Sequence, residues 1–170
     1  MNIKKNRVLS SRLEIYKEDI KFSIAHFTIF NESERENIHG HNFEVSFSVE
    51  FKSKKNGMFR NYREIKAKLR SICSQVDEYL IIPERNKYIK IKKTKSKITV
   101  LFGKDQLVFL PRDIKILPIE NTTVEDFSEW ILHQMLEDEN LISPKDVSYI
   151  QIEVSSYKGQ SGLSRMTFPS

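Results

Sequence analysis

From residue 39 to residue 50 the chain reads His39-Gly40-His41-Asn42-Phe43-Glu44-Val45-Ser46-Phe47-Ser48-Val49-Glu50. Every second residue from Phe43 to Val49 is apolar, the residues between them are polar, and His39 and His41 continue the apolar register. Strict alternation is typical of a strand with one face on a core and the other face in solvent. We therefore predict an antiparallel strand that carries two histidines at its start.

The segment before this strand has the same period of two. One face of it carries Ile20, Phe22, Ile24 and His26. The strand is expected to end near His26, because residues 31–37 are polar throughout and are typical of a loop. If the two strands pair as an antiparallel hairpin, His26 lies opposite the end that carries His39 and His41.

These three histidines form a candidate metal site. In an extended strand, His39 and His41 project from one face about 6 to 7 Å apart, and His26 can supply a third imidazole. Three neutral imidazoles with an open position are the ligand set of a catalytic zinc. The alternative, in which each histidine caps a strand or is satisfied in the core, suits a lone histidine better than three that converge.

Two other residues with reactive side chains are expected to play no part in this site. His133 lies in a predicted helix without a partner at metal-ligand spacing, so we expect it at the surface or in packing. Cys73 is the single cysteine, which excludes both an internal disulfide and a zinc site built on cysteines. Any metal must therefore be held by histidines and carboxylates.

The remaining elements follow from periodicity. Apolar residues at spacings of three and four predict a helix over about 61–76. A second helix is expected to begin at the capping box Thr122-Thr123-Val124-Glu125 and to run to about 137. Between the helices, residues 86–110 alternate in short pieces and predict one or two inserted β-hairpins. Two last strands are predicted at 147–154 and 162–168.

Length and charge restrict the class of protein. The 170 residues favour a single α+β domain over 1–170, and without an apolar run long enough to span a membrane we expect a cytoplasmic protein. The net charge of +5 is local, because residues 87–97 hold six lysines and no acid, and without them the chain would carry −1. A solvated strand pair explains this segment better than a nucleic-acid surface, since it contains one aromatic residue and no arginine.

Several spaced motifs point to a family. Phe22-Ser23-Ile24-Ala25-His26 is followed by Arg35-Glu36-Asn37-Ile38-His39-Gly40-His41-Asn42-Phe43. Later pieces, in order, are Gly57-Met58-Phe59-Arg60-Asn61-Tyr62, Val76-Asp77-Glu78, Asn121-Thr122-Thr123-Val124-Glu125 and Glu153. Over about residues 18–168 these motifs resemble the 6-pyruvoyltetrahydropterin synthase and 6-carboxytetrahydropterin synthase superfamily.

The resemblance implies the tunnelling fold, a ββααββ unit with two helices on one face of an antiparallel sheet, whose copies join into a barrel as trimers or dimers of trimers. It implies Zn²⁺ on His26, His39 and His41 at a subunit boundary. It further implies a reduced pterin anchored by Glu153, with the Thr122 and Thr123 turn beside it. A carboxylate suits this task, because it can accept two parallel N–H bonds from the pterin.

Three departures from the family pattern bear on catalysis. Many members have a cysteine base before the His-Gly-His motif, whereas Arg35-Glu36 here resembles the type III subgroup, in which a glutamate is the base. Glu36 is the expected base, provided that partial burial raises its pKa toward neutrality. Asp77-Glu78 replaces the usual Asp-His proton relay and would need to act as a buried carboxylate pair that shares a proton. Asn61 stands where an aspartate is common.

The expected activity is that of a zinc-dependent lyase. By resemblance it would cut the side chain of 7,8-dihydroneopterin triphosphate to give 6-hydroxymethyl-7,8-dihydropterin. The alternatives are 6-carboxytetrahydropterin or 6-pyruvoyltetrahydropterin synthase activity, and a zinc-binding or pterin-binding protein without turnover. The expected partners are the pterin and further copies of the chain.

Overall fold

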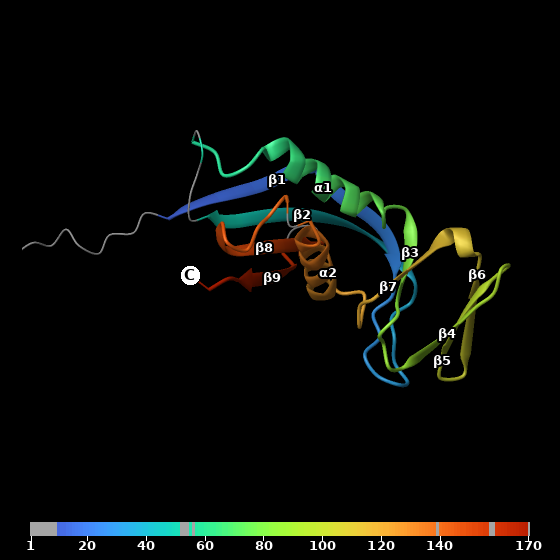
Figure 1. Cartoon of the computed structure of the whole chain (residues 1–170). Helices are drawn as coiled ribbons and strands as arrows, with labels where there is room; N and C mark the ends of the chain where they lie inside the picture. The colour runs from blue at the N-terminus through green and yellow to red at the C-terminus, as the bar shows by residue number, and fades with distance from the viewer. Residues whose placement is uncertain (1–9, 52–54, 56, 139, 157–158, 170) are drawn as a thin grey trace, which may run out of the picture.

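The computed structural model describes residues 10–51, 55, 57–138, 140–156 and 159–169. A six-stranded sheet has the order β7-β3-β1-β2-β8-β9, and a smaller sheet has the order β4-β5-β6 (Figure 1). The strands of the large sheet are β1 (Ser11–His26), β2 (His39–Phe51), β3 (Tyr79–Pro83), β7 (Ile114–Leu117), β8 (Val147–Ser155) and β9 (Ser161–Thr167). The smaller sheet contains β4 (Ile89–Lys93), β5 (Ile98–Phe102) and β6 (Asp105–Phe109). The helices are α1 (Tyr62–Ser74) and α2 (Val124–Leu136), with a short 3-10 turn at Pro111–Asp113.

The hairpin of β1 and β2 has the predicted register. His26 pairs with His39 and Ile24 pairs with His41, so the three histidines lie at one end of the hairpin. β1 begins well before the predicted segment, at Ser11, and the pairing with β2 shifts between Tyr16 and Lys21. The first half of β1 escaped prediction because its residues are mostly exposed and polar, which hides the period of two.

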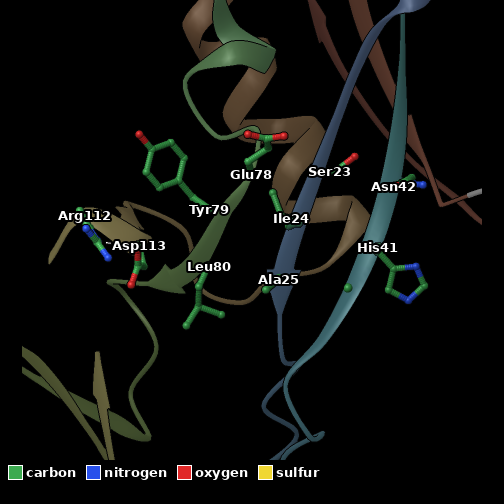
Figure 2. A pocket seen from close by; sticks show the side chains of 11 residues that line it. Ser23, Ile24, Ala25, His41, Asn42, Glu78, Tyr79, Leu80, Arg112 and Asp113 are labelled. Carbon is green, nitrogen blue, oxygen red and sulfur yellow. Dashed lines mark ion pairs between the residues drawn. The ribbon is translucent and has the colours of Figure 1, made fainter. Parts of the chain in front are cut away.

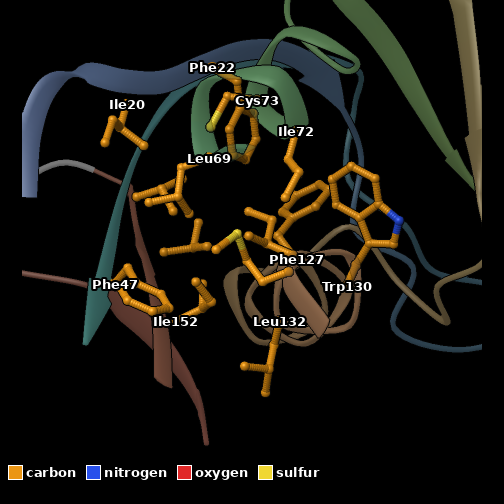
Figure 3. Packing of buried hydrophobic residues seen from close by; sticks show 14 of the residues in the cluster. Ile20, Phe22, Phe47, Leu69, Ile72, Cys73, Phe127, Trp130, Leu132 and Ile152 are labelled. Carbon is orange, nitrogen blue, oxygen red and sulfur yellow. The ribbon is translucent and has the colours of Figure 1, made fainter. Parts of the chain in front are cut away.

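The main core lies between the large sheet and both helices, which cover one face of it (Figure 3). The sheet contributes alternate residues such as Phe22, Phe47 and Ile152, as the period of two predicted. The helices contribute their apolar stripes, including Leu69 and Phe127. The prediction of an α+β fold with two helices on one face of the sheet is therefore confirmed.

Two strands of the large sheet were missed. β3 pairs with β1 in parallel at Ile24 and Ala25, and β7 pairs with β3 in parallel, so the sheet is mixed rather than wholly antiparallel. Both strands are short apolar runs, and runs of this length carry no period that separates strand from helix. They extend the large sheet at the end that carries the histidines.

The insertion, predicted as one or two hairpins, forms two, because β4 pairs with β5 and β5 pairs with β6. It does not stand apart from the rest of the chain. Its apolar face shares a second core with the loop after β1 and with β3 and β7. The buried members of this second core are Phe27, Ile29, Leu80, Ile82, Ile89, Ile98, Val100, Phe102 and Ile114.

Among the described residues, no helix is both long and apolar enough to cross a bilayer.

Candidate metal centre

Three imidazoles meet where β1 ends and β2 begins. Each of His26, His39 and His41 can offer one nitrogen, and these nitrogens lie within 4.8 Å of one another. The ring centroids are 4.6 Å apart for His26 and His39, 5.3 Å for His26 and His41, and 5.0 Å for His39 and His41. The hairpin register produces this cluster, because His26 and His39 are direct cross-strand neighbours.

Backbone carbonyls fix two of the rings. Nδ1 of His26 lies 3.0 Å from the carbonyl oxygen of Thr122, and Nδ1 of His39 lies 2.8 Å from that of Asn37. A carbonyl oxygen only accepts, so each Nδ1 carries the proton and each Nε2 keeps a lone pair. Nε2 of His26 is buried and has no hydrogen-bond partner among the described residues. A buried lone pair of this kind, beside two further imidazoles, fits a metal ion.

The protonation state of His26 supports the same reading. Burial, followed by the neighbouring His39 and His41, lowers its pKa to about 4, and the bond to Thr122 offsets only part of this effect. The ring is therefore neutral at physiological pH. A neutral imidazole is the form that ligates a metal.

The Thr122-Thr123 turn shapes this site from the second helix. Thr122 is fully buried, its carbonyl accepts from His26, and its hydroxyl donates to the carbonyl of Phe27 at 2.8 Å. Thr123 caps α2 by accepting the N–H of Asp126. Pterin contact by these threonines stays a prediction, whereas the structure gives Thr122 the separate task of orienting a histidine.

Glu36 lies in the loop between β1 and β2. One carboxylate oxygen, Oε2, accepts the N–H of Thr28 at 2.8 Å, and the Glu36 N–H donates to the Thr28 carbonyl at 2.8 Å. Burial alone would raise the pKa of Glu36, but the bonds from Thr28 and the nearby His39 and His26 lower it below its ordinary value. The expected rise toward neutrality is therefore wrong: Glu36 is a fixed, ionised carboxylate.

Asp77 and Glu78 end the turn after α1. Asp77 accepts the N–H of Ser23 at 2.7 Å, and the Glu78 N–H donates to the Ser23 carbonyl at 2.7 Å. Glu78 adopts a left-handed backbone with φ of 64°. Both residues are exposed, so the buried carboxylate pair required for a relay does not form within one chain.

A cavity of about 630 Å³ runs past this turn. Glu78, Tyr79 and Arg112 line it on one side, and the β2 segment around His41 lines it on the other (Figure 2). Figure 2 shows the imidazole of His41 directed away from Glu78, on the far side of β2. One chain therefore does not bring Glu78 to the metal centre.

Glu153 lies elsewhere on the sheet. It shares the more exposed face of β8 with Tyr149 and Gln151. It pairs with Ser46 and lines a cavity of about 250 Å³. Ser46, the cross-strand partner of Glu153, follows His41 by five residues on β2. Glu153 therefore lies roughly 16 Å along the sheet from that histidine.

Three remaining residues have structural explanations. Asn61 is the N-cap of α1 and accepts the N–H of Arg63 at 3.1 Å. Cys73 is buried in the main core, which raises its pKa to about 12 and leaves the thiol unreactive. His133 is exposed, as expected, and lies 3.7 Å from Glu129.

Two residues quoted in the family motifs make contacts near the site that the sequence did not predict. Asn121 clamps the loop after β1, because its side chain accepts the N–H of Ile29 and donates to the Ile29 carbonyl. Arg35 packs beside Glu36 and donates to its carbonyl at 2.8 Å. Neither contact could be found from spacing, because each joins segments that are distant in sequence or depends on the conformation of the loop.

Comparisons with known proteins agree with this geometry. The family model for 6-pyruvoyl tetrahydropterin synthase matches residues 14–161. The 6-pyruvoyl tetrahydropterin synthase of Plasmodium falciparum is similar in structure, with a TM-score of 0.87 and 27% identity over 94% of this chain and 99% of that one. The Plasmodium vivax protein gives a TM-score of 0.87 at 24% identity over the same shares of the two chains.

Two other structures of the Plasmodium vivax protein carry alanine or cysteine in place of a glutamate, and both are described as catalytic residue mutants. The Caenorhabditis elegans 6-pyruvoyl tetrahydropterin synthase shares the fold at a TM-score of 0.57 and 13% identity, over 96% of this chain and 100% of that one. No curated protein matches the sequence.

Proposed function

The chain belongs to the 6-pyruvoyl tetrahydropterin synthase family, and from this premise we propose that it is a zinc-dependent lyase that shortens the side chain of a reduced pterin. The substrate we assign is 7,8-dihydroneopterin triphosphate, and the product is 6-hydroxymethyl-7,8-dihydropterin. The observation that carries the proposal is the cluster of three imidazoles with Glu36 held beside it.

Zinc is the ion we assign to the cluster. Three nitrogen donors, two of them oriented by carbonyl oxygens, match the three-ligand sites of catalytic zinc. When bound, Zn²⁺ would supply Lewis-acid polarisation to the hydroxyl groups of the substrate side chain. His26, His39 and His41 would hold it.

Glu36 is the proposed base. It is ionised, and the Thr28 N–H engages one of its oxygens, which leaves further lone pairs for a substrate proton. Removal of the proton from the second side-chain hydroxyl lets the bond between the first and second side-chain carbons break. The second carbon becomes an aldehyde, and the first carbon takes a proton. The catalytic glutamate of the Plasmodium vivax protein supports this role by analogy.

A second copy of the chain is proposed to supply, through Asp77 and Glu78, the proton that the first side-chain carbon takes. Asp77 and Glu78 are exposed, and Glu78 lies away from the histidines of its own chain. Within the described residues, β9 pairs with β8 alone, and the first half of β1 pairs with β2 alone, so each presents an unpaired edge. Tyr16 on β1 and Leu163 on β9 are 74% and 52% exposed. Edge pairing between copies would cover them.

Glu153 is the proposed anchor for the pterin ring. The cavity beside it is lined by polar groups, including Tyr16, Lys17 and Ser46. A carboxylate among such groups can accept two N–H bonds from the ring. Replacement of Glu153 by Gln should raise KM by about tenfold or more with a smaller change in kcat, because a neutral amide loses one acceptor and the charge.

One incubation tests the function. Purified protein loaded with zinc is mixed with 7,8-dihydroneopterin triphosphate, and the products are separated by chromatography. Formation of 6-hydroxymethyl-7,8-dihydropterin supports the proposal, and the His39→Ala variant is the control. Formation of 6-carboxytetrahydropterin or 6-pyruvoyltetrahydropterin would instead support one of the alternative synthase activities. Unchanged substrate with bound zinc would favour a binding protein without turnover, which the presence of Asp77-Glu78 in place of an Asp-His relay also favours.

A further inference from the structure

We propose that the inserted β4-β5-β6 sheet is a positioning element for Glu36 and that Arg35 is the residue through which it acts. The inference rests on the proposed function for its kinetic consequence, but its structural part stands without it. It assigns a role to an insertion whose lysines had indicated no more than a solvated surface.

Arg35 joins the insertion to the loop that carries the base. Its guanidinium carbon lies 5.3 Å from the ring centroid of Phe27, at the end of β1, and 5.8 Å from that of Phe102 on β5. Nη1 donates to the Glu36 carbonyl at 2.8 Å, and Nη2 lies 3.5 Å from Asp105 on β6. The same planar group therefore contacts the base residue and two strands of the insertion.

The environment holds the guanidinium firmly. The Arg35 side chain is 16% exposed, and its guanidinium lies close to the rings of both Phe27 and Phe102. A partly buried cation between aromatic faces is stabilised more strongly than an exposed one, and a planar guanidinium suits this place better than an ammonium group. Loss of Phe102 would therefore release Arg35 as well as remove apolar packing.

The loop leaves Glu36 little freedom while these contacts last. Thr28 fixes the Glu36 backbone N–H and one carboxylate oxygen, and Arg35 fixes the Glu36 carbonyl. Arg35 itself forms an isolated β-bridge with Ile29 across the loop. The Glu36 backbone is consequently held at its N–H and at its carbonyl, and the contact at the carbonyl depends on the insertion through Arg35.

The insertion also packs against the loop through apolar groups and a close turn. Phe27 and Ile29 belong to the second core together with Val100 and Phe102. The turn between β5 and β6 contains Gly103, whose added Cβ would lie 3.7 Å from the Glu32 carbonyl oxygen. Figure 1 shows the loop after β1 beside the segment that leads from β3 into β4.

The test compares two phenylalanines of the same sheet. Phe102→Leu removes the ring that faces Arg35, whereas the matched control Phe109→Leu removes a ring from β6 that packs on the second core and pairs with Ile98. Zinc content, kcat, KM and the hydrogen exchange of the Thr28 and Glu36 amides are measured for both. Arg35→Met, which keeps the length and loses the charge, is measured in parallel.

We expect Phe102→Leu and Arg35→Met to lower kcat about tenfold with KM and zinc content unchanged, because a misplaced base slows the chemical step. The two amides should exchange at least several-fold faster in these variants than in Phe109→Leu. Equal exchange rates and equal kcat in Phe102→Leu and Phe109→Leu would overturn the proposal. If the parent protein has no lyase activity, the proposed function fails, and the exchange rates still decide whether the insertion holds Glu36.

Discussion

His26 is the residue on which the metal centre and the fold both depend. It is 5% exposed, it hydrogen-bonds to Thr122 from the start of the second helix, and its ring contacts both other histidines. Its environment disfavours the protonated form. Acid should therefore affect metal binding and stability together.

We predict that the metal-free protein loses stability as the pH falls below 6.5. The pKa of His26 is about 4 in the folded chain and 6.5 in an unfolded one, so the unfolded chain binds the proton first. The contribution of neutral His26 to the free energy of unfolding is fully present above pH 6.5 and is lost as the pH falls toward 4. The free energy of unfolding, measured with urea, should be about 2 kcal/mol lower at pH 5 than at pH 7.5 because of this residue. A His26→Asn variant with the same pH dependence would contradict the assignment.

At Glu36, a substitution can remove the charge of the side chain and keep its size. We predict that Glu36→Gln keeps the zinc and lowers kcat by about 10² to 10⁴, because the amide cannot accept the proton although its size is preserved. Zinc is measured by elemental analysis and kcat by product formation. Glu34→Gln, an acid in the same loop that bonds to Asn31, is the control and should retain activity. Full activity in Glu36→Gln would end its assignment as base.

At the scale of elements, the contact between α2 and β9 determines how the second helix sits. Val124 and Glu125, at the first turn of α2, lie against Gly162 of β9. Thr122, whose carbonyl orients His26, comes directly before the N-cap of this helix. The close approach of strand and helix therefore supports the metal centre.

We predict that Gly162→Ala destabilises the protein by about 3 kcal/mol. A Cβ on Gly162 would clash with the backbone carbon of Val124 and lie 2.5 Å from the backbone nitrogen of Glu125, and backbone atoms cannot move aside as a flexible side chain does. Thermal or urea unfolding measures the effect. The neighbouring Leu163→Ala, at a position 52% exposed, should change stability by less than about 0.5 kcal/mol in the isolated chain. Equal effects of the two substitutions would contradict this account.

At the scale of the whole molecule, the groups assigned to one reaction are spread over separate surfaces. The histidines lie at one end of the β1-β2 hairpin, Glu78 faces the large cavity, and Glu153 lies further along the sheet. Copies of the chain must therefore assemble if all of these groups are to act on one substrate. This requirement can be tested without a structure of the assembly.

We predict that two inactive variants complement each other. His39→Ala lacks a metal ligand, and the double variant Asp77→Asn with Glu78→Gln lacks the proposed relay. If each site takes histidines from one copy and carboxylates from another, random coassembly restores about a quarter of the parent activity per site. Coexpression followed by the product assay measures the recovery. No recovery in a confirmed mixed oligomer would place both groups in the same copy.

The sequence by itself determined the β1-β2 hairpin, both helices and the cluster of three histidines. Alternation, helical spacing and the pairing of neighbouring strands are local properties of the chain, and the fold keeps them. Through resemblance the sequence also suggested Glu36 as the base, which stays a prediction. Tertiary structure alone decided the parallel strands β3 and β7, the Thr122 carbonyl on His26, the lowered pKa of Glu36 and the contact of Arg35 with Phe102. Each of these joins segments far apart in the chain or depends on burial, and local sequence patterns reveal neither.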